Sequence, residues 1–230
     1  GSLHLTQSSL TLRPGSLSVI GDTTAIDASA STVLVSNSTI LATGGASAIS
    51  AALGSAVTVL STNVTAEDIG LAALSGSSVT LRGVVVDPGG GGGGGGTGGV
   101  GAFGLVADGG SFNGENLAVV GFPTALWAKG SQAVLKSAQL GTGVVRLNAS
   151  SAEIDSSPSL VGIAILESSS VLTLTDTDVN WTRLDVGPGS FVVPQFRATF
   201  RFFDASGRPA QGVGWQVFPA AGLPRGSGIS

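Results

Sequence analysis

The residues that could perform chemistry in this chain are few and scattered. There is one histidine, His4, and no cysteine, which excludes disulfides, thiol nucleophiles and zinc clusters. His4 stands alone near the N-terminus and no Gly-x-Ser-x-Gly motif occurs, so we expect no Ser/His/Asp site and no other catalytic residue. The formal charge of −4 argues against a nucleic-acid binder with a basic surface.

Two groups of carboxylates are candidates for a Ca²⁺ site. One group contains Asp176, Asp178 and Asp185, and the other contains Glu153 and Asp155. Neither group has the Asp-Gly periodicity of dedicated Ca²⁺ loops, so we expect no metal site. The match of residues 99–104 to the dinucleotide fingerprint arises within a glycine tract, and no helix with an acidic residue follows. We therefore expect no cofactor.

Four Asn-x-Ser/Thr sequons are more informative. They account for four of the six asparagines, namely Asn37, Asn63, Asn148 and Asn180. One interpretation is a glycosylated extracellular protein. The alternative is that Ser/Thr-rich turns happen to contain asparagine, and the sequence leaves both open.

A repeat with a period of about 19 to 24 residues must position all of these side chains. Each frame starts at a serine and has apolar residues at +2, +4 and +9. The frames start at Ser8, Ser31, Ser55, Ser77, Ser131 and Ser170. Two further frames are imperfect, because Ser111 has only Val120 in place and Ser150 slips by one residue to Leu160. A third apolar pair precedes many of the serines, including Ala125 and Trp127 before Ser131.

Apolar residues two apart predict strands, and three short strands per repeat predict the three sides of a coil. The sequence therefore predicts an all-β protein containing a single-chain parallel β-helix of about eight coils over residues 3–186. Leucine-rich and helical repeats fit less well, because their consensus and periodicity are absent. Residues 40–60 are uncharged and long enough to cross a bilayer, but the repeat makes them two strands, so we expect no membrane span.

A glycine-rich insertion explains the long step between the frames at Ser77 and Ser111. Asp87 and Pro88 are followed by an unbroken run from Gly89 to Gly96, and the insertion as a whole covers residues 87–101. Removing about a dozen residues restores the normal period. We expect this loop to leave the coil at a turn and to tolerate shortening.

Polar residues at +5 define one column along the predicted coils. The column contains Arg82, Asn116, Lys136, Asp155 and Thr175, and we expect it to point outward. Lys136 and Asp155 should be neighbours in adjacent coils. They are either the rim of a carbohydrate groove or a solvated ladder with one exposed ion pair.

The composition changes after residue 189, where six of the nine phenylalanines lie. Residues 196–203 and 212–218 alternate as strands, and residues 204–209 read as a turn between them. We expect a C-terminal antiparallel β-hairpin or partial β-sandwich over residues 190–230, following a β-helix over residues 1–189. The hairpin should cap the last coil near Leu184 or pair with a neighbouring molecule.

Residues 68–82, Asp-Ile-Gly-Leu-Ala-Ala-Leu-Ser-Gly-Ser-Ser-Val-Thr-Leu-Arg, resemble one coil of a pertactin-like autotransporter passenger. They are equally similar to generic right-handed β-helix repeats of secreted surface proteins. The segment from residue 190 resembles the opening hairpin of an immunoglobulin-like or carboxypeptidase-regulatory-like module. Right-handedness follows from this resemblance and from the usual handedness of parallel crossovers.

These resemblances imply an extracellular structural or adhesive cell-surface β-solenoid. They are also compatible with a subunit of a larger surface assembly or filament. Its expected partners are other surface proteins or copies of itself through the C-terminal hairpin, and carbohydrate. The alternative is a polysaccharide-binding or polysaccharide-cleaving enzyme on the same scaffold. We expect no nucleic-acid partner.

Overall fold

The computed structural model describes residues 2–44, 47–89, 102–157, 162–177, 179, 181–197, 201, 203, 208, 214–217 and 226–229. The chain forms two compact units, which divide after Phe196. The first unit is a parallel β-solenoid of about eight coils, as the repeat predicts. The right-handed winding of its coils stays a prediction.

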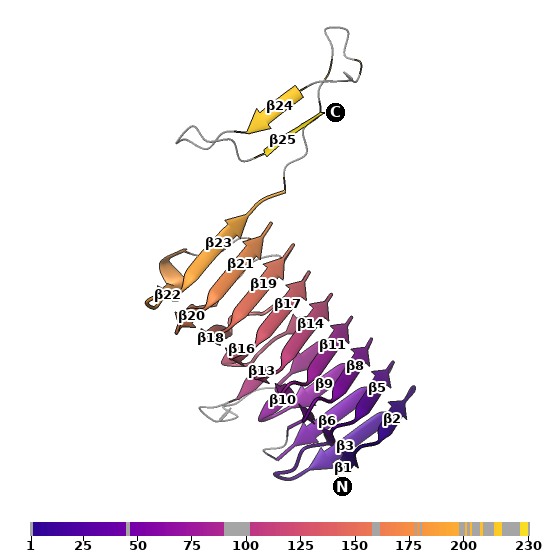
Figure 1. Ribbon diagram of the computed structural model, residues 1–230. Coiled ribbons are helices and arrows are strands. Elements are labelled where there is room, and N and C mark those ends of the chain that lie inside the picture. The colour runs from indigo at the N-terminus through magenta and orange to yellow at the C-terminus, as the bar shows by residue number, and fades with distance from the viewer. Residues whose placement is uncertain are drawn as a thin grey trace. The chain divides into compact units, whose positions relative to one another are not determined.

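Two nine-stranded parallel sheets form two sides of the solenoid (Figure 1). Sheet A contains, in spatial order, β1 (Leu3–Thr6), β4 (Ile26–Ser29), β7 (Ile49–Ala52), β10 (Ile69–Leu74), β13 (Phe103–Asp108), β16 (Thr124–Lys129), β18 (Val144–Asn148), β20 (Ala164–Glu167) and β22 (Leu184–Val186). Sheet B contains β2 (Ser9–Leu12), β5 (Thr32–Ser36), β8 (Ala56–Leu60), β11 (Ser78–Arg82), β14 (Ser111–Glu115), β17 (Gln132–Lys136), β19 (Ser151–Asp155), β21 (Val171–Thr175) and β23 (Phe191–Gln195).

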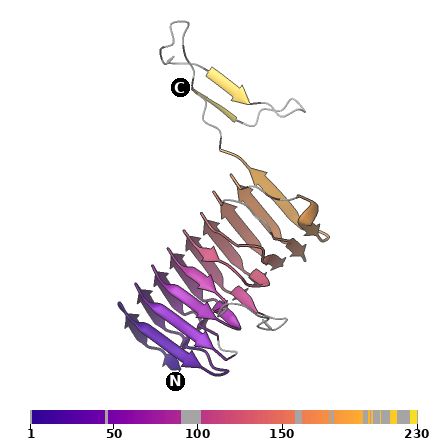
Figure 2. The ribbon, with the colours of Figure 1, turned by 180° about the vertical axis from the view of Figure 1, so that it is seen from behind.

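The third side, sheet C, is shorter. It contains β3 (Ser16–Ile20), β6 (Thr39–Thr43), β9 (Asn63–Ala66), β12 (Val85–Asp87) and β15 (Ala118–Val119). No later strand joins sheet C among the described residues, and one 3-10 turn, η1 (Trp181–Arg183), lies near the end of the solenoid. The view from behind in Figure 2 shows the same stack of strands.

The apolar columns of the repeat point inward, as predicted. Val57, Val79 and Leu135 each expose 1% of their surface or less. Equivalent residues of neighbouring coils are in register, as Val57 is with Val79. Parallel strands place such residues about 4.8 Å apart, so the columns form stacked ladders in one continuous hydrophobic core. No single coil could bury these side chains alone.

The frame assigned to Ser111 is wrong by one residue and starts at Gly110. The register pairs Phe112 with Val79, and Val119 is buried where Val120 was expected. A Cβ atom on Gly110 would lie 2.4 Å from the carbonyl oxygen of Ala73. This close approach excludes a serine at the start of the fifth coil, and the missing serine signal shifted the frame.

A ladder of serines explains why the other frames begin with this residue. The backbone N–H of Ser31 donates to Ser55 Oγ at 3.0 Å, and that of Ser55 donates to Ser77 Oγ at 3.1 Å. Ser31 Oγ and Ser55 Oγ also donate within their own coils, to the carbonyls of Ser29 and Ala52, both at 2.7 Å. The buried corner therefore has its polar groups satisfied. The ladder resumes after Gly110 and reaches Ser190, a frame start that the sequence analysis missed.

The coils become shorter where sheet C ends. Successive serines of the ladder are separated by 23, 24 and 22 residues from Ser8 to Ser77. From Ser131 to Ser190 they are separated by 19, 20 and 20 residues. The lost residues come from the third side, because sheets A and B keep their strands throughout. The glycine-rich insertion joins β12 to β13, and its residues 90–101 lie outside the described part of the chain.

The second unit starts at Arg197, and it contains an antiparallel pair of strands. The strand expected at 212–218 is present as β24 (Gly214–Val217), and its partner among the described residues is β25 (Gly226–Ile229). Residues 198–200 and 202 of that expected strand lie outside the described part. The solenoid extends past residue 189, because β23 pairs with β21 as a ninth strand of sheet B. Among the described residues, no helix is long and apolar enough to cross a membrane.

Candidate functional site

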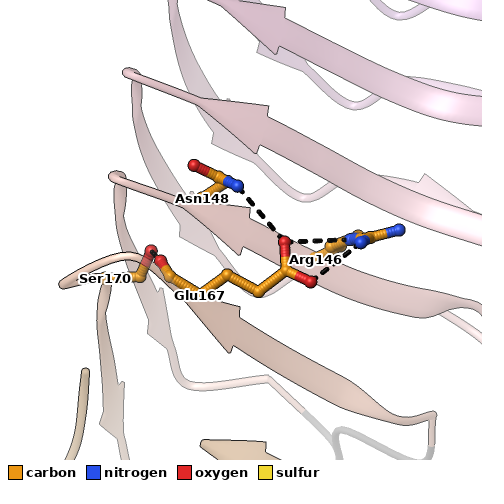
Figure 3. A network of polar contacts seen from close by, with 4 residues as sticks. All are labelled: Arg146, Asn148, Glu167 and Ser170. Atoms are coloured by element: carbon orange, nitrogen blue, oxygen red, sulfur yellow. Dashed lines mark hydrogen bonds and ion pairs between the residues drawn. The ribbon is translucent and has the colours of Figure 1, made fainter. Parts of the chain in front are cut away.

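A network of polar side chains lies on the outer face of sheet A, where two narrow coils meet. Arg146 and Asn148 belong to β18, and Glu167 lies opposite Asn148 on β20. Arg146 Nη2 donates to Glu167 Oε1 at 2.8 Å and its Nε donates to Oε2 at 3.4 Å, while Asn148 Nδ2 donates to Oε2 at 3.2 Å (Figure 3). The carboxylate therefore holds a two-point contact with the guanidinium and a third bond from the amide.

The contacts shift the titration of both charged groups. Hydrogen bonds from Arg146 and then Asn148 lower the pKa of Glu167, because they favour its ionised form. The hydrogen bond and the charge of Glu167 raise the pKa of Arg146 in turn. The two side chains expose 47% and 35% of their surface, so solvent screens the pair. The network therefore fixes the orientation of the three side chains and adds little to the stability of the fold.

An aromatic pair lies one and two coils away on the same outer face. Trp127, on β16, is in register with Arg146 and is partly buried. Its ring centroid lies 6.3 Å from that of Phe103, with the rings tilted by 55°. This distance and angle are within the range of favourable aromatic contacts. The sequence analysis gave Trp127 and Ala125 as one apolar pair, but the structure separates them, because Ala125 is buried and Trp127 lies on the outer face.

The reason for this correction is a bulge in sheet A. The register between β16 and β18 shifts between Thr124 and Leu126, so Ala125 and Leu126 both lie in the core. Ala128 is buried as well, which leaves Trp127 between two inward residues and turns it outward. A strict two-residue alternation cannot detect this extra residue. The spacing of Arg146 and Glu167, about one coil apart, was a signal that could have found the network.

The column at +5 differs from the expectation in three positions, and one of them is Thr175, which is buried with 8% of its surface exposed. Lys136 and Asp155 are neighbours in register, as predicted. Glu115 replaces Asn116 in the column because the fifth frame starts at Gly110, and it lies 3.5 Å from Arg82 in an ion pair. Asp155 is buried rather than outward, with 6% of its surface exposed, and it accepts a hydrogen bond from Ser156 Oγ at 2.8 Å. The column alternates in charge from Arg82 to Asp155, which supports a polar ladder.

The three described sequons differ in their surroundings. Asn37 and Asn63 are exposed, and Asn37 occupies a left-handed corner with a φ of 50°. Asn148 is partly buried, and the amide nitrogen that would carry a glycan donates to Glu167. Asn180 lies outside the described residues. Glycosylation of all four positions stays a prediction.

The remaining candidate residues do not come together. Among the described residues, no group of three or more His, Asp or Glu side chains could hold a metal ion. Asp178 lies outside this part of the chain, as do residues 99–101 of the fingerprint match, and Phe103 begins a strand rather than a helix. His4 contacts Ser2 Oγ at 2.9 Å and Asp27 Oδ2 at 3.4 Å on the surface.

A shallow groove of about 440 Å³ lies at the corner where sheet C ends. Its polar side chains are Asn116, Ser137, Gln139 and Ser156, beside the backbone of Gly83 and Val84. These amides and hydroxyls can donate and accept hydrogen bonds, but none of them titrates near neutral pH. The groove could hold a polar ligand and has no group for acid–base chemistry.

The network, the aromatic pair and the groove are thus surface features of a solenoid, and they lie outside its core. Comparisons with protein-family models, with curated proteins and with solved structures gave no match to this chain.

Proposed function

We propose that this protein is an extracellular structural or adhesive β-solenoid of a cell surface. The observation that supports it is the continuous apolar core across the coils, together with the serine ladder that runs along it on both sides of Gly110. In the described residues every buried side-chain nitrogen or oxygen has a hydrogen-bond partner. Such an interior resists deformation, because sheets A and B both join each coil to the next. A stiff support that presents its surface to partners makes use of this construction.

The resemblance of residues 68–82 to pertactin-like passengers supports the same proposal. A glycine-rich insertion between β12 and β13 leaves the stacked strands of sheets A and B in register. In this proposal the solenoid displays the insertion and its outer faces, and the unit from Arg197 joins it to other surface proteins or copies of itself. Size measurement of the full chain and of residues 1–196 tests the last point, and an assembly formed by residues 1–196 alone would contradict it.

The location is tested by surface labelling of intact cells that produce the protein. Antibodies against the solenoid should label unbroken cells, and added protease should remove the label. A cytoplasmic protein, labelled in the same cells, controls for leakage. Labelling that appears only after lysis would contradict the proposal.

A second candidate function is polysaccharide binding or cleavage on the same scaffold. The specific observation in favour of binding is the aromatic pair beside the network of Arg146, Asn148 and Glu167. Cleavage would require an acid and a base in contact with the same sugar. Incubation with polysaccharides and an assay for new reducing or unsaturated ends tests it, and release of such ends would favour the enzyme over the scaffold.

A further inference from the structure

The outer face of sheet A combines an aromatic pair with a network of polar side chains. Outer residues of two neighbouring strands form an apolar area, with Phe103 and Val106 on β13 and Trp127 on β16. Arg146, Asn148 and Glu167 border it on β18 and β20. We call these six residues the aromatic surface. An apolar centre with fixed polar groups at its edge is the usual anatomy of a binding site.

Val106 shows that the apolar part is already compact. It lies on the outer face in register with Trp127, yet only 7% of its surface is exposed. Phe103 and Trp127 are partly exposed, so their rings shield what lies beneath and still offer area to a partner. Rings held in this way lose little conformational freedom on binding, which favours affinity.

The polar border is also held in place before any ligand arrives. Glu167 accepts bonds from both Arg146 and Asn148, which fixes the planes of the guanidinium and the amide. In Figure 3 the second Nη of Arg146 and Oδ1 of Asn148 point away from Glu167. They provide a donor and an acceptor in fixed directions, beside an aromatic residue one strand away.

The charges of this surface are matched within it. Arg146 contacts Glu167 directly, so the one positive and the one negative charge among the six residues are paired with each other. A charged ligand would have to compete with one of these partners. A neutral ligand with many hydroxyl groups would not, because hydroxyls both donate and accept hydrogen bonds.

We propose that the aromatic surface binds a neutral carbohydrate, with a pyranose ring stacked on Trp127 and its hydroxyls bonded to Arg146 and Asn148. The C–H face of a pyranose is apolar and its edge is polar, which matches a ring bordered by fixed polar groups. Adjacent strands lie about 4.8 Å apart, close to the width of one sugar ring, so several sugars of a chain can follow the coils. This inference rests on the proposed adhesive function and gives that function a ligand class.

The experiment uses the full chain and titrates it with cellohexaose, mannohexaose and laminarihexaose, with hexagalacturonate as the charged comparison. Calorimetry and tryptophan fluorescence report binding. At least one neutral oligosaccharide should bind and alter the fluorescence. Trp127→Ala should weaken that binding at least tenfold and Arg146→Gln several-fold, while Trp127→Phe, which keeps an aromatic ring, should bind within a few-fold of the original chain.

Matched controls come from sheet B. Arg82→Gln breaks an exposed ion pair of the same kind, and Phe191→Ala removes an exposed ring, so both variants should bind as the original chain does. Circular dichroism confirms that each variant is folded. If Trp127→Ala unfolds, Arg146→Gln and Trp127→Phe still decide the result.

Several outcomes would overturn the proposal. These are no binding of any neutral oligosaccharide, tighter binding of hexagalacturonate, or equal binding by Arg146→Gln and the original chain. Sedimentation provides another, because self-association that Trp127→Ala abolishes would make this surface a protein interface. Each of these results would leave the surface labelling of cells unaffected, so the failure of the carbohydrate site and the failure of the cell-surface role are distinguishable.

Discussion

The solenoid has a wide part and a narrow part, and each part encloses the apolar core with a different set of sheets. The wide coils, residues 3–119, contribute strands to three sheets, whereas the described residues of the narrow coils, within 124–195, contribute only to sheets A and B. Both parts keep the serine ladder and the inward columns of sheet B. The comparison shows that the third side is the adjustable one. Residues can be lost there, or added as in the glycine-rich insertion, without changing the register of sheets A and B.

The largest difference between the two parts should appear in their cores. Leu81 and Leu135 occupy the same ladder on either side of Gly114, and both are fully buried. Replacement of either by Ala should cost about 2–5 kcal/mol in the free energy of unfolding, measured by denaturant titration. Leu135→Ala should be the milder change, because a narrow coil without a strand of sheet C can close around the cavity more readily. A larger cost at Leu135 would contradict this view of the narrow part.

The serine ladder should show a smaller effect in both parts. Ser55→Ala leaves the N–H of Ser31 without its acceptor, and Ser150→Ala does the same to Ser131. Loss of a buried acceptor costs about 1–3 kcal/mol. Ser31 is buried whereas Ser131 is partly exposed, so water can replace the acceptor more easily in the second case. Thermal and denaturant unfolding of the two variants should therefore give the larger loss for Ser55→Ala. Equal stability of both variants and the original chain would mean that the ladder contributes nothing.

The pH dependence should distinguish the ion pair of the narrow part. The pKa of Glu167 is lowered in the folded chain, so its contribution is present above the ordinary glutamate range and is lost as the pH falls through the lowered value. Melting temperatures of Glu167→Gln and the original chain should differ slightly at about pH 7 and converge as the pH falls below the ordinary glutamate range. Added salt should reduce the difference. Glu115→Gln, which removes the exposed partner of Arg82, is the control. A difference that grew on acidification would have the wrong sign.

The smallest effect should come from the glycine-rich insertion. Deletion of several glycines within residues 90–96 should leave the melting temperature nearly unchanged, since loop length enters stability only as a logarithm, about 0.6 kcal/mol per doubling. At least one glycine should remain directly after Pro88, because a Cβ atom at position 89 would lie 2.6 Å from Thr65 Cγ2. A fall of many degrees would show that the glycines pack as part of the structure.

The sequence was sufficient to predict the repeat, the strand columns and the position of the insertion, because period-two patterns and serine spacing are local signals. It failed at Gly110, where a close approach to Ala73 forbids the serine that marks every other frame. It failed again at Trp127, because a bulge adds a residue that alternation cannot show. Both errors have the same cause. The close approach at Gly110 and the bulge before Trp127 are set by the neighbouring coil, and the sequence pattern of a single strand does not show them. The aromatic surface lies where these irregularities occur.

The serine ladder also bears on how such a protein could change its length. Its bonds join equivalent positions of neighbouring coils, so Ser31 and Ser55 each have the same two relations, to the coil before and the coil after. The segment from one of these serines to the next is therefore one coil that could be repeated in the chain without a change at either end. Duplication of the segment from Ser31 to Ser55 would regenerate both of its boundaries and extend the solenoid by one strand spacing, about 4.8 Å. The length of such a solenoid is therefore set by its number of whole coils.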